Sequence, residues 1–428
     1  MKGHTAAPGI ENKVFVFVFQ FKSRIVVRKK EKTTVEMASH SQVLVEEKSS
    51  VRILTLNRPK QLNALSFQMI SRLLQLFLAY EEDPSVKLVI LKGQGRAFCA
   101  GGDVSAVVRD IQQGNWRLGA KFFSDEYMLN YVMATFSKPQ VSILNGIVMG
   151  GGAGVSVHGP FRIATENTVF AMPETVLGLF PDVGASYFLS RLPGFFGEYV
   201  GLTGARLDGA EILACGLATH FVPSTRLTAL EAELCKVDSS DPTFVSTILD
   251  AYTQRPHLKQ QSAYHRQVYL IISLILSIVP EFAELDVIDR CFSGRTVEEI
   301  IAALEREATH GGDDWISITI RALKKASPAS LKISLRSIRE GRLQGVGQCL
   351  SREYRMVCHV LKGDISKDFV EGCRAILIDK DKNPKWEPWR LEEMKDRMVE
   401  QYFKRVEEEE DLKLPPRKNL PALAMAKL

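Results

Sequence analysis

The sequence predicts an α/β fold, in which a layered core of strands and helices is followed by a largely helical C-terminal region. Residues 43–112 show the order strand, strand, helix, strand, glycine-rich turn, helix. A similar order of strands, glycine-rich turn and helix recurs over residues 140–194. After about residue 205 strand patterns thin out, and apolar residues recur mainly at helical spacing.

The first strands and helix follow from local patterns. Residues 43–59, "VLVEEKSSVRILTLNRP", alternate as two strands around a Lys-Ser-Ser turn, which predicts a β-hairpin. Ser66 is placed to cap a helix, whose apolar stripe at helical spacing consists of Met69, Ile70, Leu73, Leu74, Phe77 and Leu78. "KLVILKG", residues 87–93, reads as a buried strand, and the glycines of "GRAFCAGGDVSAVVRDI" turn the chain into the next helix.

The later elements repeat this pattern. "QVSILNG" predicts a strand, "VMGGGAGVSVHG" a glycine-rich turn and helix, "FRIATE" and "TVFAM" strands, and "GASYFLSRLPG" a helix. Helices are expected at "TVEEIIAALEREA" and around "PASLKIS" in the C-terminal part. We divide the chain into a non-folding extension (1–36), a core (37–225), a helical region (226–412) and a flexible tail (413–428).

Charge and residue counts exclude several classes of protein. Removing the eight basic and three acidic residues of 1–36 from the totals of 55 and 50 leaves 47 of each, so the body is neutral and lacks the charge of a nucleic-acid binder. The seven cysteines form no Cys-x-x-Cys pair and the eight histidines no His-x-x-x-His pair, so we predict no metal site. The longest apolar run, residues 268–279, is shorter than the roughly 20 residues of a membrane-spanning helix.

Two carboxylates stand in a segment that is otherwise made of apolar residues, glycine, proline and threonine. In "FAMPETVLGLFPDVG" these are Glu174 and Asp182. A charge in apolar surroundings is costly unless it is paired, hydrogen-bonded or protonated. The segment therefore either forms a reactive site or, as the simpler alternative, provides a helix cap or an exposed loop.

Two glycine runs lie where helices are expected to begin. Gly101-Gly102-Asp103 and Gly150-Gly151-Gly152 can bring backbone N–H groups close to a ligand, because glycine has no side chain in the way. Neither run fits the spacing of a nucleotide-binding loop. Two such N–H groups suit an oxygen that becomes negative during a reaction, as in an oxyanion hole, although close helix packing also explains glycine-rich turns.

These motifs together resemble the crotonase (enoyl-CoA hydratase/isomerase) superfamily. The resemblance rests on "NRPKQLNAL", "AFCAGGD", "NGIVMGGGAGVSVHG" and "MPETVLGLFPDVGASYFLSRLPG". Downstream, "SLKISLRSIREG", "EYRMVCH", "DFVEGCRAILIDKDKNPKW" and "EPWR" are similar to the 3-hydroxyisobutyryl-CoA hydrolase branch. The resemblance implies a crotonase-like core of ββα spiral units that binds a coenzyme A thioester and has no other cofactor.

The resemblance also implies roles for individual residues. Gly102 and Gly151 would form the oxyanion hole, and Glu174 and Asp182 would be the catalytic acids. Glu126, in "DEYMLN", would contact the substrate, although an acid in a first helical turn needs no special reason. The residues expected beside the coenzyme are Ala100, Gly101 and Asp103.

Position 154 separates the hydratases of this superfamily from its hydrolase branch. A hydratase of this superfamily uses two glutamates, and the position of the first is Gly154 here. Thioester hydrolysis demands less acid assistance, because a thiolate of pKa near 8.5 is a good leaving group. The resemblance thus favours hydrolysis of 3-hydroxyisobutyryl-CoA; the alternatives are a hydratase or isomerase that uses Glu174 alone and a non-catalytic scaffold that binds acyl-CoA.

Three further segments carry expectations. Residues 1–36 and 267–285 have no counterpart that the resemblance leads us to expect. Ala426-Lys427-Leu428 resembles the Ser-Lys-Leu address that a peroxisomal import receptor reads, which favours the peroxisome over the mitochondrion. Trimer-based assembly is common in the superfamily, so the resemblance makes a homo-oligomer one option for this chain.

Overall fold

The computed structural model describes three stretches of the chain, 41–259, 286–309 and 314–417, and the single residue 262. The expectations for 1–36, 267–285 and the C-terminal tripeptide concern residues outside these ranges and stay predictions. From Gln42 onward the chain forms one unit, to which the following description is confined.

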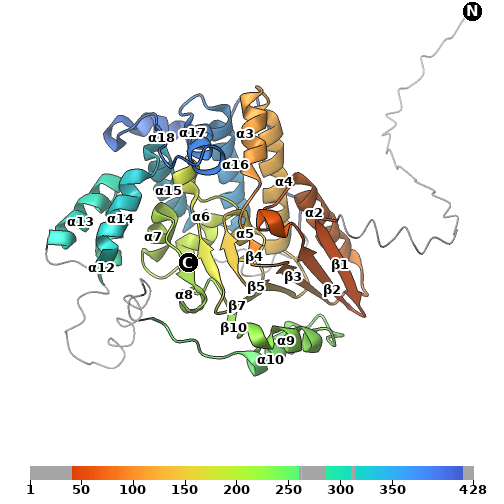
Figure 1. Cartoon of the computed structure of the whole chain (residues 1–428). Coiled ribbons are helices and arrows are strands. Elements are labelled where there is room, and N and C mark those ends of the chain that lie inside the picture. The colour runs from red at the N-terminus through yellow and green to blue at the C-terminus, as the bar shows by residue number, and fades with distance from the viewer. Residues whose placement is uncertain (1–40, 260–261, 263–285, 310–313, 418–428) are drawn as a thin grey trace, which may run out of the picture. The chain divides into compact units, whose positions relative to one another are not determined.

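The larger sheet has six strands in the order β1-β2-β3-β5-β7-β10 (Figure 1). Its strands are β1 (Val43–Lys48), β2 (Val51–Leu56), β3 (Leu88–Gly93), β5 (Gln140–Leu144), β7 (Phe161–Ala164) and β10 (His220–Phe221). The expected hairpin is confirmed, since β1 and β2 pair antiparallel, and all other neighbours are parallel.

The smaller sheet shows how the chain winds into a spiral. Its order is β4-β6-β8-β9, from β4 (Ala97–Cys99), β6 (Ile147–Met149), β8 (Val169–Ala171) and β9 (Leu207–Asp208). Successive strands alternate between the two sheets. In each of the pairs β3 and β4, β5 and β6, and β7 and β8, the first strand joins the larger sheet and the second joins the smaller one. The first three strands of the smaller sheet are parallel, so the turns that follow them come out at one edge.

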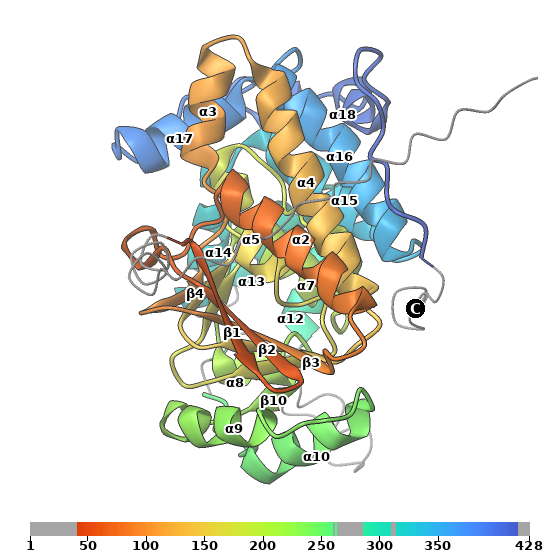
Figure 2. The ribbon, with the colours of Figure 1, turned by 90° about the vertical axis from the view of Figure 1, so that its right-hand side faces the viewer.

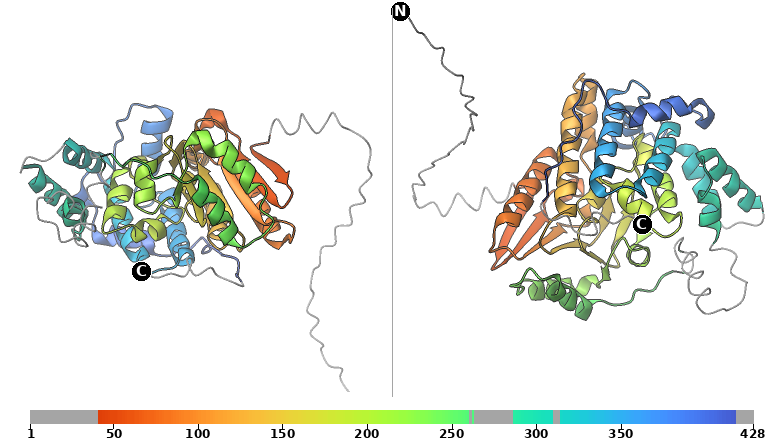
Figure 3. Two further views of the ribbon diagram at one scale, coloured as in Figure 1. Left: turned by 90° about the horizontal axis from the view of Figure 1, so that it is seen from below. Right: turned by 180° about the vertical axis from the view of Figure 1, so that it is seen from behind.

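Both faces of the larger sheet are covered, because alternate residues of a strand point to opposite sides. In β3, Val89 and Leu91 belong to the main core, whereas Leu88 and Ile90 belong to a second cluster on the other face. Helices α9 (Leu227–Leu234) and α10 (Pro242–Tyr252) complete that second cluster. They lie over the strands when the molecule is seen from below (Figure 3).

Helix α2 (Phe67–Glu82) begins as predicted and buries a slightly different face. The Ser66 hydroxyl accepts a hydrogen bond from the Met69 N–H, which confirms the cap. The predicted stripe is wrong at its C-terminal end, where Leu78 is 40% exposed and Leu76 and Tyr80 are buried instead. The helix packs against both β1 and α4 (Trp116–Ala134). Because it is covered from these two directions, the side of the helix that carries Leu76 and Tyr80 is buried.

The remaining helices confirm a largely helical C-terminal region, which packs on the same main core. Before residue 226 they are α3 (Val104–Gln112), α5 (Gly151–Gly154), α6 (Ala185–Phe188), α7 (Phe196–Thr203) and α8 (Gly209–Ala214). After it they are α12 (Asp286–Phe292), α13 (Val297–Thr309), α14 (Asp314–Lys325), α15 (Pro328–Gly341), α16 (Val346–Lys362), α17 (Asp368–Cys373) and α18 (Asp396–Phe403). Helix α16 runs beside α4 (Figure 2), and a π-helix, η5 (Arg374–Ile378), follows α17.

Candidate active site

The two glycine turns meet at the edge of the smaller sheet. Strands β4 and β6 are neighbours, so the turns that follow Cys99 and Met149 start side by side. A Cβ placed on Gly151 would lie 3.1 Å from the amide nitrogen of Gly102. Gly151 opens α5, where backbone N–H groups have no partner inside the helix. Within the described residues neither of the two N–H groups donates to a protein acceptor, so both are available to a ligand oxygen.

Two glutamates reach this turn from different elements. Glu174 begins the short 3-10 helix η2 (Glu174–Leu177), and its Oε1 lies 2.7 Å from where a Cβ on Gly150 would be. Glu126 comes from α4, and a Cβ on Gly151 would overlap its Oε1. Both side chains are buried, with 1% exposure for Glu126 and 5% for Glu174. Glu126 Oε1 and Glu174 Oε2 accept no hydrogen bond in the described structure, which is unusual for buried oxygens.

The simpler explanations of these acids were a helix cap, an exposed loop and an acid in a first helical turn, and all three are wrong. Glu126 lies in the middle of α4 and is buried, so it is not an acid that merely favours a helix N-terminus. Glu174 makes no capping hydrogen bond of the kind proposed, and Asp182, which is 4% exposed, lies in a buried segment and not on a surface loop. The three acids instead converge from α4, η2 and the loop after it on one cavity.

Asp182 is held by a tyrosine and lies near a fourth acid, neither of which is singled out by a local sequence motif. The Tyr127 hydroxyl donates a 2.8 Å hydrogen bond to Asp182 Oδ2. Glu353, on α16, accepts hydrogen bonds from the backbone N–H groups of Gly184 and Ser186, directly after Asp182. Glu353 has 0% exposure.

A sequence signal for the fourth acid does exist. Glu353 falls on the apolar stripe of its helix, with Cys349 and Leu350 one turn before it and Met356 and Val357 one turn after it. All four of these neighbours are buried. A charge on an apolar stripe needs a partner or a purpose, and this would have singled out Glu353.

Burial and mutual repulsion raise the pKa values of the acids. Burial raises the pKa of Glu174 and of Glu126 well above the usual range of a carboxyl, and the negative charge of Asp182 adds to both. Burial raises the pKa of Asp182 to about 7. The hydrogen bond from Tyr127 lowers this pKa, and the negative charge of Glu353 raises it further. At neutral pH the group therefore holds protons that it can exchange, as acid-base chemistry requires.

The cavity that these residues surround has a volume of about 350 Å³. The predicted coenzyme-binding residues Ala100, Gly101 and Asp103 line it, so the structure brings them together with the acids. Asp103 is itself paired with Arg58 at 3.0 Å. Part of the wall comes from residues 376 and 377 of the π-helix η5, which no local pattern had linked to the site.

Gly154 leaves no space for a second glutamate on α5. A Cβ there would lie 2.6 Å from Val183 Cβ and 2.9 Å from Asn130 Nδ2. Separations under 3.0 Å require neighbouring atoms to move. The position that carries an acid in the hydratase pattern is thus closed by packing in this chain.

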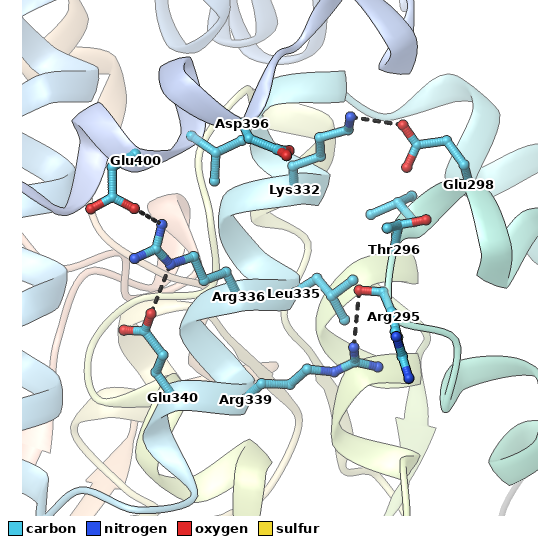
Figure 4. Close-up of a pocket in the computed structure, with 12 residues that line it drawn as sticks. Arg295, Thr296, Glu298, Lys332, Leu335, Arg336, Arg339, Glu340, Asp396 and Glu400 are labelled. Carbon is cyan, nitrogen blue, oxygen red and sulfur yellow. Dashed lines mark hydrogen bonds and ion pairs between the residues drawn. The ribbon is translucent and has the colours of Figure 1, made fainter.

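A larger cavity, of about 550 Å³, lies between α13, α15 and α18 (Figure 4). Two of its cations are matched by acids, since Arg336 pairs with Glu340 at 2.7 Å and with Glu400 at 2.6 Å, and Lys332 pairs with Glu298 at 2.7 Å. None of Glu126, Glu174 and Asp182 lines this cavity. We therefore place the candidate active site in the smaller cavity.

The described parts of the chain contain neither of two other kinds of feature, a metal site and a membrane span. There, no group of three or more His, Cys, Asp and Glu residues could hold a metal ion. No helix of those parts has the length and apolar character to cross a membrane.

The family model described as "Enoyl-CoA hydratase/isomerase" matches residues 51–403. The chain belongs to the enoyl-CoA hydratase/isomerase family. The family fold also appears in a solved structure, a carnitinyl-CoA dehydratase from Mycobacterium thermoresistibile, with a TM-score of 0.74 and 36% identity. That match covers 88% of this chain and 100% of the dehydratase, and it confirms the predicted crotonase-like fold.

Relatives within the enoyl-CoA hydratase/isomerase family carry different names. The chain is 84% identical over 394 residues to 3-hydroxyisobutyryl-CoA hydrolase 1 of Arabidopsis thaliana, which covers 92% of this chain and 100% of that protein. It is 43% identical over 385 residues to small ribosomal subunit protein mS47 of the same plant, with coverage of 89% and 90%. Membership of the family thus fixes the fold, and the activity has to be argued from the site.

Proposed function

We propose that this protein hydrolyses 3-hydroxyisobutyryl-CoA to 3-hydroxyisobutyrate and coenzyme A. The observation that carries the proposal is the convergence of Glu126, Glu174 and Asp182 on the same cavity as the free N–H groups of Gly102 and Gly151. The 84% identity to a relative named for this hydrolysis supports the choice of substrate.

The two glycine N–H groups would hold the thioester oxygen. Both would donate hydrogen bonds to this oxygen, and the bonds would strengthen as the carbonyl carbon is attacked and the oxygen becomes negative. The Gly151 N–H also lies at a helix start, where the backbone dipoles favour negative charge. Such donors discriminate the transition state from the substrate, and this is how they lower the barrier.

Glu174 would carry the bond-making step in one of two ways. Its carboxylate either attacks the carbonyl carbon to form an anhydride, which water then hydrolyses, or it takes a proton from a water molecule that attacks directly. In both routes the carbon–sulfur bond breaks and coenzyme A leaves as a thiolate, which then takes up a proton. The unpartnered Oε2 of Glu174 is an oxygen with which either route can begin.

Asp182 and Glu126 would position the acyl group. Asp182 lies beside the cavity with one oxygen held by Tyr127, so its other oxygen can accept a hydrogen bond from the 3-hydroxyl of the substrate. Glu126 Oε1 has no protein partner and lies at Gly151. A site that hydrogen-bonds a hydroxyl discriminates strongly against an analogue without it, so isobutyryl-CoA should be a poor substrate.

The alternatives have weaker support. A hydratase of the two-glutamate type needs an acid at position 154, where packing leaves no space. A non-catalytic scaffold gains interest from the relative named as a ribosomal protein. However, a scaffold has no use for three buried acids with raised pKa values, which are costly to keep in a folded chain.

Thiol release from 3-hydroxyisobutyryl-CoA tests the proposal. The thiol is detected with a thiol reagent, and the loss of crotonyl-CoA absorbance is followed in parallel. Wild type, Glu174→Gln and Glu305→Gln are compared, because Glu305 is an exposed acid of α13 away from the cavity. We expect release by wild type and Glu305→Gln, its loss in Glu174→Gln, and no consumption of crotonyl-CoA.

Other results would refute the proposal. Consumption of crotonyl-CoA without thiol release would make the protein a hydratase. Inactivity toward both substrates in a sample with native circular dichroism would favour the scaffold. Equal hydrolysis of isobutyryl-CoA and its 3-hydroxy analogue would contradict the role given to Asp182.

A further inference from the structure

The loop that carries Asp182 has an unfavourable backbone conformation. Val183, the next residue, has φ +55°, and Gly184 has φ +83°. Positive φ is common for glycine, but for a β-branched residue such as valine it is a true outlier. Strained residues of this kind persist only where surrounding contacts hold them, and they are frequent at active sites.

One contact that holds the loop comes from a half-buried histidine. Nε2 of His158 lies 2.8 Å from the carbonyl oxygen of Val183. A carbonyl oxygen only accepts hydrogen bonds, so this nitrogen carries the proton and donates. Burial lowers the pKa of His158 to about 4, and the ring is therefore neutral at physiological pH. The ring also packs against Gly184, where a Cβ would lie 2.5 Å from Cε1.

The other contact is a carboxylate from a distant part of the chain. Glu353 accepts hydrogen bonds from the Gly184 N–H at 2.7 Å, the Ser186 N–H at 3.0 Å and the Ser186 hydroxyl at 2.5 Å. The neighbouring cation on its helix, Arg352, donates to the Ser337 carbonyl oxygen instead. Glu353 is fully buried and does not line the active-site cavity, so it cannot touch the substrate.

We propose that Glu353 is a positioning residue, which holds the strained loop so that Asp182 faces the substrate. This inference rests on the proposed function. Helix α16 is suited to the task, because it packs along α4, which carries Tyr127, the other partner of Asp182. The ring of Tyr354 on α16 also lies edge-on to Tyr127, with centroids 6.5 Å apart. One helix therefore fixes both the loop and the tyrosine that together orient the Asp182 carboxylate.

The charge of Glu353 adds a second effect that a purely mechanical role would lack. Four acidic groups face Asp182, namely Glu126 and Tyr127 from α4, Glu174 from η2 and Glu353 from α16. Removing the Glu353 charge takes away one repulsion, which lowers the pKa of Asp182. The acidic limb of the rate profile, where Asp182 becomes ionised, would then move to lower pH.

The test compares Glu353→Gln with Glu198→Gln in the full-length protein. Glu198 is also fully buried, but it pairs with Arg342 at 2.7 Å and does not line the active-site cavity. In Glu353→Gln an amide NH₂ faces a backbone donor, so the loop loses a hydrogen bond. We expect kcat for thiol release to fall about 100-fold with KM changed less than about 2-fold, because misplacing a catalytic group has this order of effect. Glu198→Gln should lower the melting temperature and leave kcat and the pH profile in place.

Two further variants keep the test decisive. Ser186→Ala removes one of the three hydrogen bonds and should lower kcat about 10-fold even if Glu353→Gln does not fold. Val183→Gly removes the strain, so Glu353→Gln should cost less in that background than in wild type.

The outcomes separate the two proposals. An active wild type with unchanged kcat and acidic limb in Glu353→Gln, or with an equal loss of kcat in Glu198→Gln, would overturn the positioning role alone. A wild type that releases no thiol would overturn the proposed function and the positioning role with it.

Discussion

Replacing Asp182 by asparagine should inactivate the protein and at the same time stabilise it. Asparagine keeps the size of the side chain and an oxygen that can accept the Tyr127 hydrogen bond. It removes a buried charge whose pKa lies far above its value in the unfolded chain. We expect loss of thiol release together with a rise in the free energy of unfolding, as is common for acids in active sites.

The magnitude follows from the pKa of Asp182, which rises from 3.8 to about 7 on folding. Below pH 4 the group is protonated in both states and has no effect. Between pH 4 and 7 the folded state alone keeps the proton, so the free energy of unfolding of wild type falls by about 1.4 kcal/mol per pH unit. Above pH 7 the full cost applies. The advantage of Asp182→Asn should therefore grow to about 4 kcal/mol at pH 8.

Urea unfolding followed by circular dichroism at pH 5, 6, 7 and 8 measures this difference. Asp411→Asn is the matched control, because Asp411 is held by Arg355 and its pKa is lowered. That substitution should destabilise the protein by the same amount at all four pH values, because the Asp411 carboxylate is ionised in both the folded and the unfolded state above about pH 5. An Asp182→Asn variant that is less stable than wild type at pH 8, or whose advantage does not change with pH, would refute the reasoning.

Three other substitutions give distinct results. Gly151→Ala places a methyl group against Glu126 and should reduce kcat by about 100- to 1,000-fold, as measured by thiol release from a sample with native circular dichroism. Tyr127→Phe removes the hydrogen bond that favours ionised Asp182, so the acidic limb of the kcat profile should move to higher pH, opposite to the shift expected on loss of the Glu353 charge. Gly154→Glu should lower the melting temperature without creating crotonyl-CoA hydration, since the side chain has no space.

Local sequence patterns predicted the elements that depend on local physics. The hairpin of β1 and β2 follows from alternation around a short turn, and the start of α2 follows from the Ser66 cap. Leu78 was misplaced because the direction from which other elements cover a helix is a property of the fold. The apolar pattern of a helix shows which face is buried, but it does not show which side of that face the neighbouring elements will cover.

The candidate site was predictable only where the chain itself brings residues together. Gly102 and Gly151 follow β4 and β6, which are parallel neighbours in the smaller sheet, so their turns come out at one edge. Glu174 and Asp182 stood out as charges in an apolar segment. Glu353 is 169 residues from Gly184 in the sequence, and their contact depends on the packing of α16 against the core. No local rule reports a contact at that distance.

The C-terminal helices explain how the fold tolerates such a site. Four carboxylates, on Glu126, Glu174, Asp182 and Glu353, are at most 5% exposed, and burial of each acid acts against folding. Apolar residues of α12 to α18 join the same hydrophobic cluster as the strands and α4, and their burial opposes that cost. The helical region that brings Glu353 to the Asp182 loop thus also supplies apolar burial that helps to keep the acids inside, and for both reasons it belongs to the active site as much as the glycine turns do.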